Sequence, residues 1–137
     1  APRAGSANIL EDGASIAETI TLPSTVEASS LNIAFLAEEV QWLDSSVVSV
    51  EGTDASGARV FRTEAPANSL HDGLHSFPAD GLVLRGGEKY TVTITSRMTE
   101  GGYARVMINP AVDQFPTTEN GTTVHGDLLM TIAGRTK

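Results

Sequence analysis

The stretch KYTVTITS, residues 89–96, decides the fold class of this 137-residue chain. Its apolar residues alternate one by one with polar residues, most of them threonine. Successive side chains of a β-strand point to opposite faces of the sheet, so the stretch predicts a strand with one buried row and one solvent-facing row. We therefore expect Val92 and Ile94 to be buried. Thr91 and Thr93 should be more exposed, because threonine is a good strand former for the solvent-facing side.

Other short segments of the strand type flank this one at spacings of roughly 8–15 residues, the pattern of a sandwich or barrel. They are Ser15–Leu22, Ser30–Leu36, Val47–Gly52, Ala58–Thr63, Gly81–Arg85, Tyr103–Asn109 and Asp127–Ala133. The helical candidate, Ala37–Leu43, is short and is interpreted as a bend or a single turn. The sequence therefore predicts an all-β fold, an antiparallel β-sandwich of about eight or nine strands, with residues 13–137 as a single domain.

Glycine-containing turns separate several of these segments. The sequence DASG at residues 54–57 predicts a hairpin turn in which Asp54 caps the turn and Gly57 has a positive φ. The sequences RGGE at residues 85–88 and EGG at residues 100–102 predict two further turns.

The composition of residues 1–12 predicts a flexible N-terminal arm. These residues are mostly small or polar, and they lack the alternation of apolar and polar residues that is typical of a strand. The arm contains an apolar pair, Ile9 and Leu10. Water disfavours exposing such a pair, so we expect the arm to be unpacked in the isolated subunit and to become ordered against a partner chain. The start at Ala1 fits either loss of an initiator methionine or removal of a leader.

The composition excludes several classes of partner and of site. The chain has 17 acidic and 9 basic residues, a net charge of −8, and no cluster of basic residues. Nucleic acids and anionic membrane surfaces attract clustered Lys and Arg, so we expect neither as a partner. No apolar run approaches the roughly 20 residues that a membrane-spanning helix needs. The absence of cysteine excludes disulfides, thiolate metal sites and cysteine nucleophiles.

Two histidines form a candidate metal site. His71 and His75 lie four residues apart, a spacing that could hold a metal on a helix. Gly73 and the following Phe77 and Pro78 argue against a helix. On an extended chain the two histidines are roughly 13 Å apart, too far for one ion, so the segment is interpreted as a solvated loop.

Aspartates near separate predicted turns could together hold a structural calcium ion, because calcium binds carboxylate and carbonyl oxygens. The candidate ligands are Asp44, Asp80 and Asp113. No stretch has the alternating Asp/Asn spacing of a calcium loop, so the alternative is that these residues cap turns and keep the surface soluble. No other cofactor is expected.

The residue spacings of the sequence match no catalytic motif. No serine lies in a Gly-x-Ser-x-Gly nucleophile elbow, and neither Gly-Gly pair precedes a predicted helix or ends in the Gly-Lys-Ser/Thr of a phosphate loop. We therefore expect a protein that is not an enzyme.

Trp42 is the candidate for an exposed aromatic ring that binds a sugar by stacking. The alternative is that Trp42 fills the core of the sandwich. An aromatic content of 5% disfavours a flat aromatic platform for a glycan.

Two strands resemble parts of a known type of module. The sequences LRGGEKYTVTI at residues 84–94 and GDLLMTIAG at residues 126–134 are similar to strands, the second of them the closing strand, of jelly-roll modules in bacteriophage virion proteins and bacterial extracellular multidomain proteins. The resemblance covers roughly residues 15–134. It implies a sandwich of the jelly-roll type that serves as a decoration domain or a carbohydrate-binding-like domain.

Two functions from different classes follow as expectations. The first is a non-enzymatic structural or accessory protein, a decoration, spike or tail component at the surface of a phage virion, with protein partners and a homo-oligomeric state. The second is a carbohydrate-binding module of an extracellular enzyme or adhesin, with a glycan as its partner. The single β-domain, the N-terminal arm and the lack of a catalytic constellation favour the first.

Overall fold

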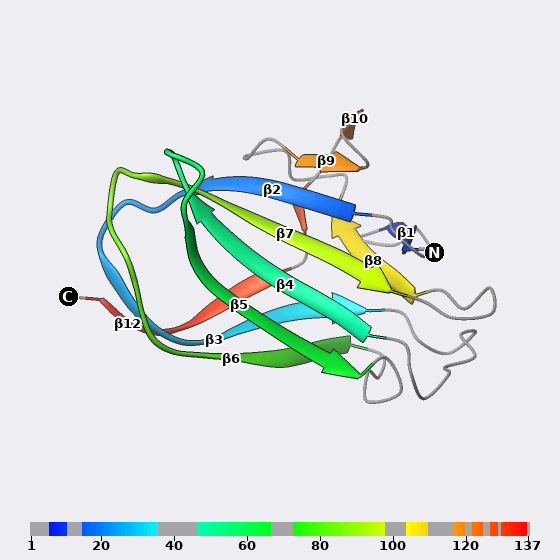
Figure 1. Cartoon of the computed structure of the whole chain (residues 1–137), viewed down its shortest axis with the longest axis horizontal. Helices are drawn as coiled ribbons and strands as arrows, with labels where there is room; N and C mark the ends of the chain where they lie inside the picture. Colours follow the sequence, from blue (N-terminus) through cyan, green and yellow to red (C-terminus); the bar gives the residue numbers. More distant parts are fainter. Residues whose placement is uncertain are drawn as a thin grey trace.

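A computed structural model describes residues 6–10, 15–35, 47–66, 73–97, 104–109, 117–119, 122–124, 127–128 and 130–136. These residues form β-strands with short turns between some of them, and no helix (Figure 1). Accordingly, no helix that could cross a membrane occurs among them. The strands are β1 (Ser6–Leu10), β2 (Ser15–Thr21), β3 (Val26–Phe35), β4 (Val47–Asp54), β5 (Arg59–Pro66), β6 (Gly73–Leu84), β7 (Lys89–Arg97), β8 (Ala104–Asn109), β9 (Thr117–Glu119), β10 (Thr122–Val124), β11 (Asp127–Leu128) and β12 (Met130–Thr136).

The strands form two antiparallel sheets that lie face to face (Figure 1). In sheet A, β8 pairs with β1, β3 and β11, and β3 pairs in addition with β6 and β12. In sheet B the order is β10-β9-β2-β7-β4-β5. The predicted antiparallel β-sandwich is therefore confirmed. The strands outnumber the expected eight or nine because β1 lies in the expected arm and β9 to β11 are too short to show an alternating pattern.

Strand β7 lies inside sheet B, between β2 and β4. Tyr90, Val92 and Ile94 are 4%, 3% and 0% exposed. Thr91 and Thr93 are half-buried on the outer face. The predicted alternation of this strand is therefore confirmed, and its buried row faces sheet A.

The core fills the space between the two sheets. Its largest fully buried hydrophobic side chains are Leu31, Ile33, Phe35 and Phe77 of sheet A and Ile16, Val48, Val50 and Ile94 of sheet B. The rings of Phe35 and Phe77 lie 6.1 Å apart on neighbouring strands, at an interplanar angle of 55°. Side chains that interdigitate in this way set the spacing of about 10 Å between the sheets of a sandwich.

The turn between β4 and β5 has the predicted geometry. Gly57 has a φ of 87°, a conformation that residues with a Cβ atom rarely adopt, so the prediction for Gly57 is confirmed. Asp54 caps the turn, because its Oδ1 accepts hydrogen bonds from the Ser56 hydroxyl at 2.6 Å and from the Ala58 amide at 3.0 Å. The hydrogen bond from the Ser56 hydroxyl is the main reason why the pKa of Asp54 is lowered. Desolvation by burial acts in the opposite direction, and the hydrogen bonds from the backbone amides of the turn lower the pKa further.

The N-terminal segment differs from the expected flexible arm. Residues 6–10 form β1, which pairs antiparallel with β8, so that Ile9 lies opposite Arg105 and Leu10 opposite Ala104. The expectation that this segment stays unpaired in the isolated subunit is therefore wrong for its backbone. Main-chain pairing with β8, and not an apolar alternation, makes it a strand, and such pairing leaves no pattern in the sequence.

Strand β6 is longer than the sequence pattern predicts. It pairs with β3 from Gly73 to Leu84, whereas the alternation predicts a strand only from Gly81. His75 is half-buried in this strand, with its ring 4.7 Å from and edge-on to that of Phe77, so the interpretation of a solvated loop is wrong here. Asp80 likewise lies in the strand. A shift of register against β3 interrupts the two-residue period, and this hides the strand from pattern analysis.

Candidate functional site

A cleft opens between β5 and β6. In the described part of the chain β5 pairs only with β4 and β6 only with β3, so both are edge strands, and they contact each other along one side of the sandwich (Figure 1). The cleft has a volume of about 280 Å³, slightly below the range of about 300–1,000 Å³ that is usual for ligand pockets. It is lined by Val60, Phe61 and Arg62 of β5 and by Pro78, Ala79, Gly81 and Leu82 of β6.

A bulge shapes the β5 wall of the cleft. Gly52 of β4 lies opposite Phe61, whereas the next residue of β4 lies opposite Arg59. Val60 is thus an extra residue in the strand pairing, and it is 36% exposed. Bulges bend an edge strand and redirect its side chains, which here places an apolar side chain at the mouth of the cleft.

A longer interruption shapes the β6 wall. Pro78 lies opposite Ser30 and Leu82 lies opposite Ala28. Residues 79–81 of β6 therefore span the place of one residue of β3, and Gly81 has a φ of 81°. Proline lacks a backbone N–H, so this wall does not offer the continuous row of main-chain donors and acceptors that a further strand would need.

The ring of Phe61 connects the cleft to the core. It is half-buried and packs against the core cluster from the β5 side. It also occupies the place where a Cβ atom of Gly52 would lie on the neighbouring strand, so only glycine permits this ring position. Leu82 of the opposite wall is 7% exposed. The cleft thus leads from solvent to side chains that lie between the two sheets.

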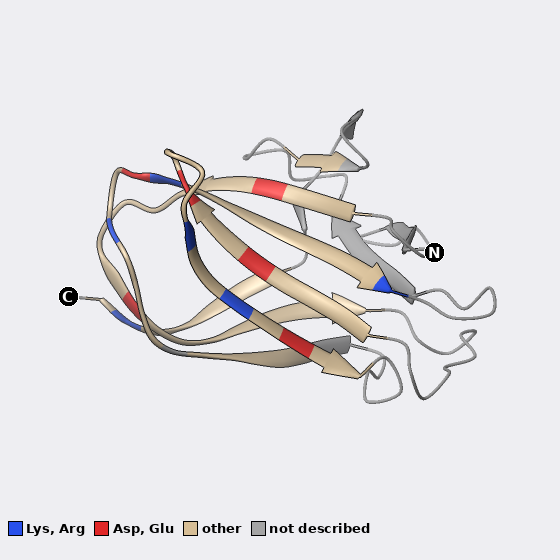
Figure 2. Ribbon diagram, viewed as in Figure 1, with Lys and Arg blue, Asp and Glu red and all other residues tan. Residues whose placement is uncertain are grey.

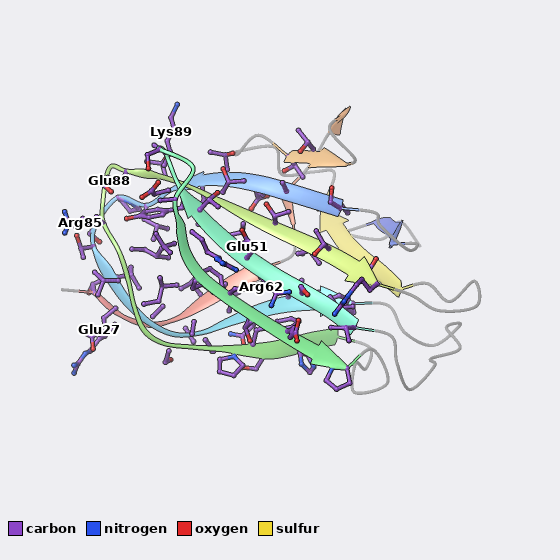
Figure 3. All side chains as sticks on the ribbon, in the orientation of Figure 1. Glu27, Glu51, Arg62, Arg85, Glu88 and Lys89 are labelled. Atoms are coloured by element: carbon purple, nitrogen blue, oxygen red, sulfur yellow. The ribbon has the colours of Figure 1, made fainter. Side chains whose placement is uncertain are left out.

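A polar network lies beside the cleft on the outer face of β4 and β5. Arg62 Nη2 lies 3.1 Å from Glu64 Oε2 and donates to the Ser49 hydroxyl at 3.3 Å. Ser49 donates in turn to Glu64 Oε2 at 3.3 Å. Glu51 lies opposite Arg62 in the strand register, and Figure 3 labels both side chains. The side chains of Arg62 and Glu64 are 41% and 45% exposed, so their ion pair contributes little to stability.

The rest of the outer face of sheet B is rich in hydroxyl groups. Thr19 of β2 and Thr91 of β7 lie in register, with their hydroxyl oxygens 3.0 Å apart. Figure 2 shows no charge on β7 between its ends, Lys89 and Arg97. The described Phe and Tyr rings belong to the core or to the cleft and not to this face. This face therefore offers hydrogen-bond donors and acceptors without an aromatic platform.

Among the described residues, one carboxyl group lies inside the sandwich. Glu18 is 3% exposed and shares the inner face of β2 with Ile16 and Ile20. Its Oε1 accepts a hydrogen bond of 3.2 Å from the hydroxyl of Thr117, which lies opposite it on β9. In the sequence Glu18 is visible only as the interruption of an apolar row. The position of β9 supplies the buried hydrogen-bond donor that a carboxyl group needs at such a place.

Four of the site residues expected from the sequence lie outside the described residues, namely Trp42, Asp44, His71 and Asp113. Asp80 lies in the β6 wall, in the interruption described above. No group of three or more His, Cys, Asp or Glu residues in the described segments could hold a metal ion. The structural calcium ion and the glycan-stacking tryptophan therefore stay predictions.

The cleft between β5 and β6 was not foreseen from the sequence, although two signals for it are present. Pro78 inside a strand indicates an edge or a bulge. Gly52 inside a strand indicates that another group approaches the backbone closely. Neither signal identifies the neighbouring strand, because β5 and β6 belong to different sheets.

No family model matches this chain, and no curated protein does either. What the chain can do has to be inferred from its own residues. The cleft and the adjoining outer face supply main-chain polar groups, a guanidinium group and hydroxyl groups, which are groups for binding.

Proposed function

We propose that this chain is a structural accessory protein that attaches to an assembly through protein–protein contacts, and that the assembly is a phage virion. The observation that carries the proposal is the strand order. In sheet A the strands β1, β8, β3 and β6 are neighbours in this order, with β12 beside β3, and in sheet B β2, β7, β4 and β5 are neighbours. This order supports a jelly-roll winding, an architecture that builds viral capsid proteins as well as lectins.

The edge strands β5 and β6 supply a second line of support. A protein present in many copies on a surface must not polymerise through exposed sheet edges. The bulge at Val60 and the interruption that follows Pro78 disfavour such pairing, while the cleft between them stays accessible. This combination suits attachment through one specific surface at the virion exterior.

A carbohydrate-binding module of an extracellular protein is the second candidate. The observation that favours it is the network of Ser49, Arg62 and Glu64 beside the hydroxyl-rich face of sheet B. These groups could donate to and accept from the hydroxyl groups of a sugar. An aromatic side chain that stacks on the sugar ring would have to come from elsewhere in the chain, and Trp42 is the candidate.

Light scattering coupled to size-exclusion chromatography, together with a glycan array, separates the two functions. We expect the isolated chain to form a homo-oligomer and to bind no glycan. A monomer that binds a glycan would contradict the proposal and favour the module. In that case Arg62→Ala should abolish glycan binding. Arg135→Ala serves as the matched control, because Arg135 forms its ion pair with Glu27 in sheet A, at 3.2 Å.

A further inference from the structure

We propose that the free edge of β12 pairs antiparallel with the same strand of a second copy of this chain, so that sheet A continues from one copy into the other. This inference rests on the proposed function, because it specifies the surface and the symmetry of the homo-oligomer expected there. Four features of β12 lead to it: its position at a sheet edge, its unbroken run of residues, its half-buried apolar side chains and its charge.

Strand β12 lies at one end of the strand order in sheet A. In the described part of the chain Met130–Thr136 pairs along its whole length with β3 and with no other strand. A strand that is paired on one side directs every second N–H and C=O away from its neighbour. Within the described residues these main-chain groups of β12 have no strand partner, so they can pair with a further strand.

The edge of β12 is the longest unbroken one among the described edge strands. Its register with β3 shifts at one place, but the extra residue is Ser29 of β3, so β12 itself continues without a bulge. Its seven residues, MTIAGRT, include no proline. By contrast, Val60 interrupts β5, Pro78 and residues 79–81 interrupt β6, and β1 and β10 have five and three residues. The devices that prevent strand pairing at β5 and β6 are therefore missing from β12.

Two apolar side chains of β12 are left half-buried at this edge. Met130 and Ile132 pack against the core cluster but are only partly buried. Their neighbours in register on β3, Ile33 and Leu31, are 0% and 1% exposed. A further strand beside β12 would cover more of the surface of Met130 and Ile132, and burial of apolar surface favours association.

The charge of β12 favours a second copy of the same strand. The chain has a net charge of −8, so two copies repel each other wherever acidic residues meet. Strand β12 has no acidic residue, and its one charged residue, Arg135, already pairs with Glu27 of β3 at 3.2 Å. An antiparallel strand can pair with its own copy about a two-fold axis, and dimers of this symmetry are the commonest homo-oligomers. An axis at the middle residue, Ala133, pairs all seven residues and places Arg135 opposite Thr131 of the second copy, so like charges do not meet.

Sedimentation velocity of the full chain, from about 1 μM to about 1 mM, measures the association over the range of a small interface. We expect a concentration-dependent equilibrium between monomer and dimer. Ala133→Lys places two ammonium groups opposite each other at the axis, and it should raise the dissociation constant of the dimer at least about fivefold. Val83→Lys makes the same change of charge on β6, the opposite edge strand of sheet A, where Val83 is 40% exposed. This control should leave the dissociation constant unchanged, and a thermal unfolding curve checks that both variants fold.

A cysteine scan locates the two-fold axis. The chain contains no cysteine, so a single introduced cysteine can form a disulfide only with its copy in a second chain. Residues directly opposite each other on antiparallel strands have Cβ atoms about 4.5–5.5 Å apart, close to the distance that a disulfide needs. We expect Ala133→Cys to form a covalent dimer on mild oxidation, seen on a non-reducing gel. Val83→Cys, on the opposite edge strand, should stay monomeric.

The proposal is overturned if the native chain stays monomeric at every concentration, if Ala133→Lys associates as tightly as the native chain, or if Ala133→Cys cross-links no better than Val83→Cys. These outcomes differ from a failure of the proposed function. A chain that dimerises through β12 and binds a glycan contradicts attachment to a virion but leaves this inference standing. A homo-oligomer that binds no glycan and persists at full affinity in Ala133→Lys contradicts this inference and leaves the proposed function standing.

Discussion

Ile94 lies at the centre of sheet B, opposite Ile16 of β2 and Val50 of β4, and is fully buried. Replacing it with alanine removes buried methyl groups and leaves a cavity. We expect Ile94→Ala to lower the free energy of unfolding by about 2–5 kcal/mol, measured by urea denaturation. Thr93→Ala, on the outer face of the same strand, should cost less than about 1 kcal/mol. Equal losses in the two variants would mean that the register of β7 is wrong.

Glu18 shows that a polar residue on an apolar row can belong to the core. Its carboxylate accepts a hydrogen bond from Thr117, and both side chains are buried. Thr117→Val keeps the shape of the side chain and removes the donor, so we expect a loss of about 1–3 kcal/mol in the free energy of unfolding. The neighbouring Thr118→Val, on the outer face of β9, is the matched control and should change it by less than about 0.5 kcal/mol. Equal effects would argue against a buried bond.

Asp54 makes the stability of the β4–β5 turn depend on pH. The Ser56 hydroxyl and the turn amides lower its pKa in the folded chain below the ordinary value of 3.8. A carboxyl group with a lowered folded pKa stabilises the fold fully above its ordinary pKa, and this contribution is lost as the pH falls through the folded value. The difference in unfolding free energy between the native chain and Asp54→Asn should therefore be constant at neutral pH and shrink below about pH 4.

Chemical denaturation at a series of pH values measures this difference. Ser56→Ala removes the main cause of the pKa shift and should shrink the pH-dependent part of the difference. A difference that grows as the pH falls would contradict the cap geometry.

At the scale of the element, strands differ in how much their own sequence specifies. The alternation in β7 is complete, because an interior strand of a two-layer sandwich has one buried face and one solvent-facing face along its length. In β6 the interruption at residues 79–81 breaks the same period, so half of the strand has no signal. Strand β1 has no signal at all, because its place depends on pairing with β8, about a hundred residues later in the chain.

Strand β1 gives a test at this scale. Deleting residues 1–10 removes the main-chain partner of β8 from Ala104 to Ile108. We expect the deletion to lower the melting temperature, because the pairing and the surface that it covers contribute to stability. Deletion of residues 1–5, which lie before β1, is the control and should have a smaller effect. An unchanged melting curve after the longer deletion would show that β1 does not pair in solution.

At the scale of the whole molecule, the sheets join strands that are far apart in the sequence. β1 pairs with β8, β2 with β9 and β3 with β12. Forming such non-local pairs requires the closure of long loops before the contacts can stabilise them. We expect refolding from urea to take milliseconds to seconds, the range of β-sandwiches of high contact order, as measured by stopped-flow circular dichroism. Complete refolding within microseconds would contradict this topology.

The sequence by itself determined the fold class, the buried row of β7 and the turn at residues 54–57. These features are local: alternation depends on the pleat of a single strand, and a turn depends on the conformations of four residues. The tertiary structure alone decided that residues 6–10 pair with β8, that Glu18 meets Thr117, and that β5 and β6 form the walls of one cleft. Each of these features needs two segments that belong to different parts of the chain, and their proximity is set by the order of strands in the two sheets. A residue pattern within one segment carries no information on which other segment lies beside it.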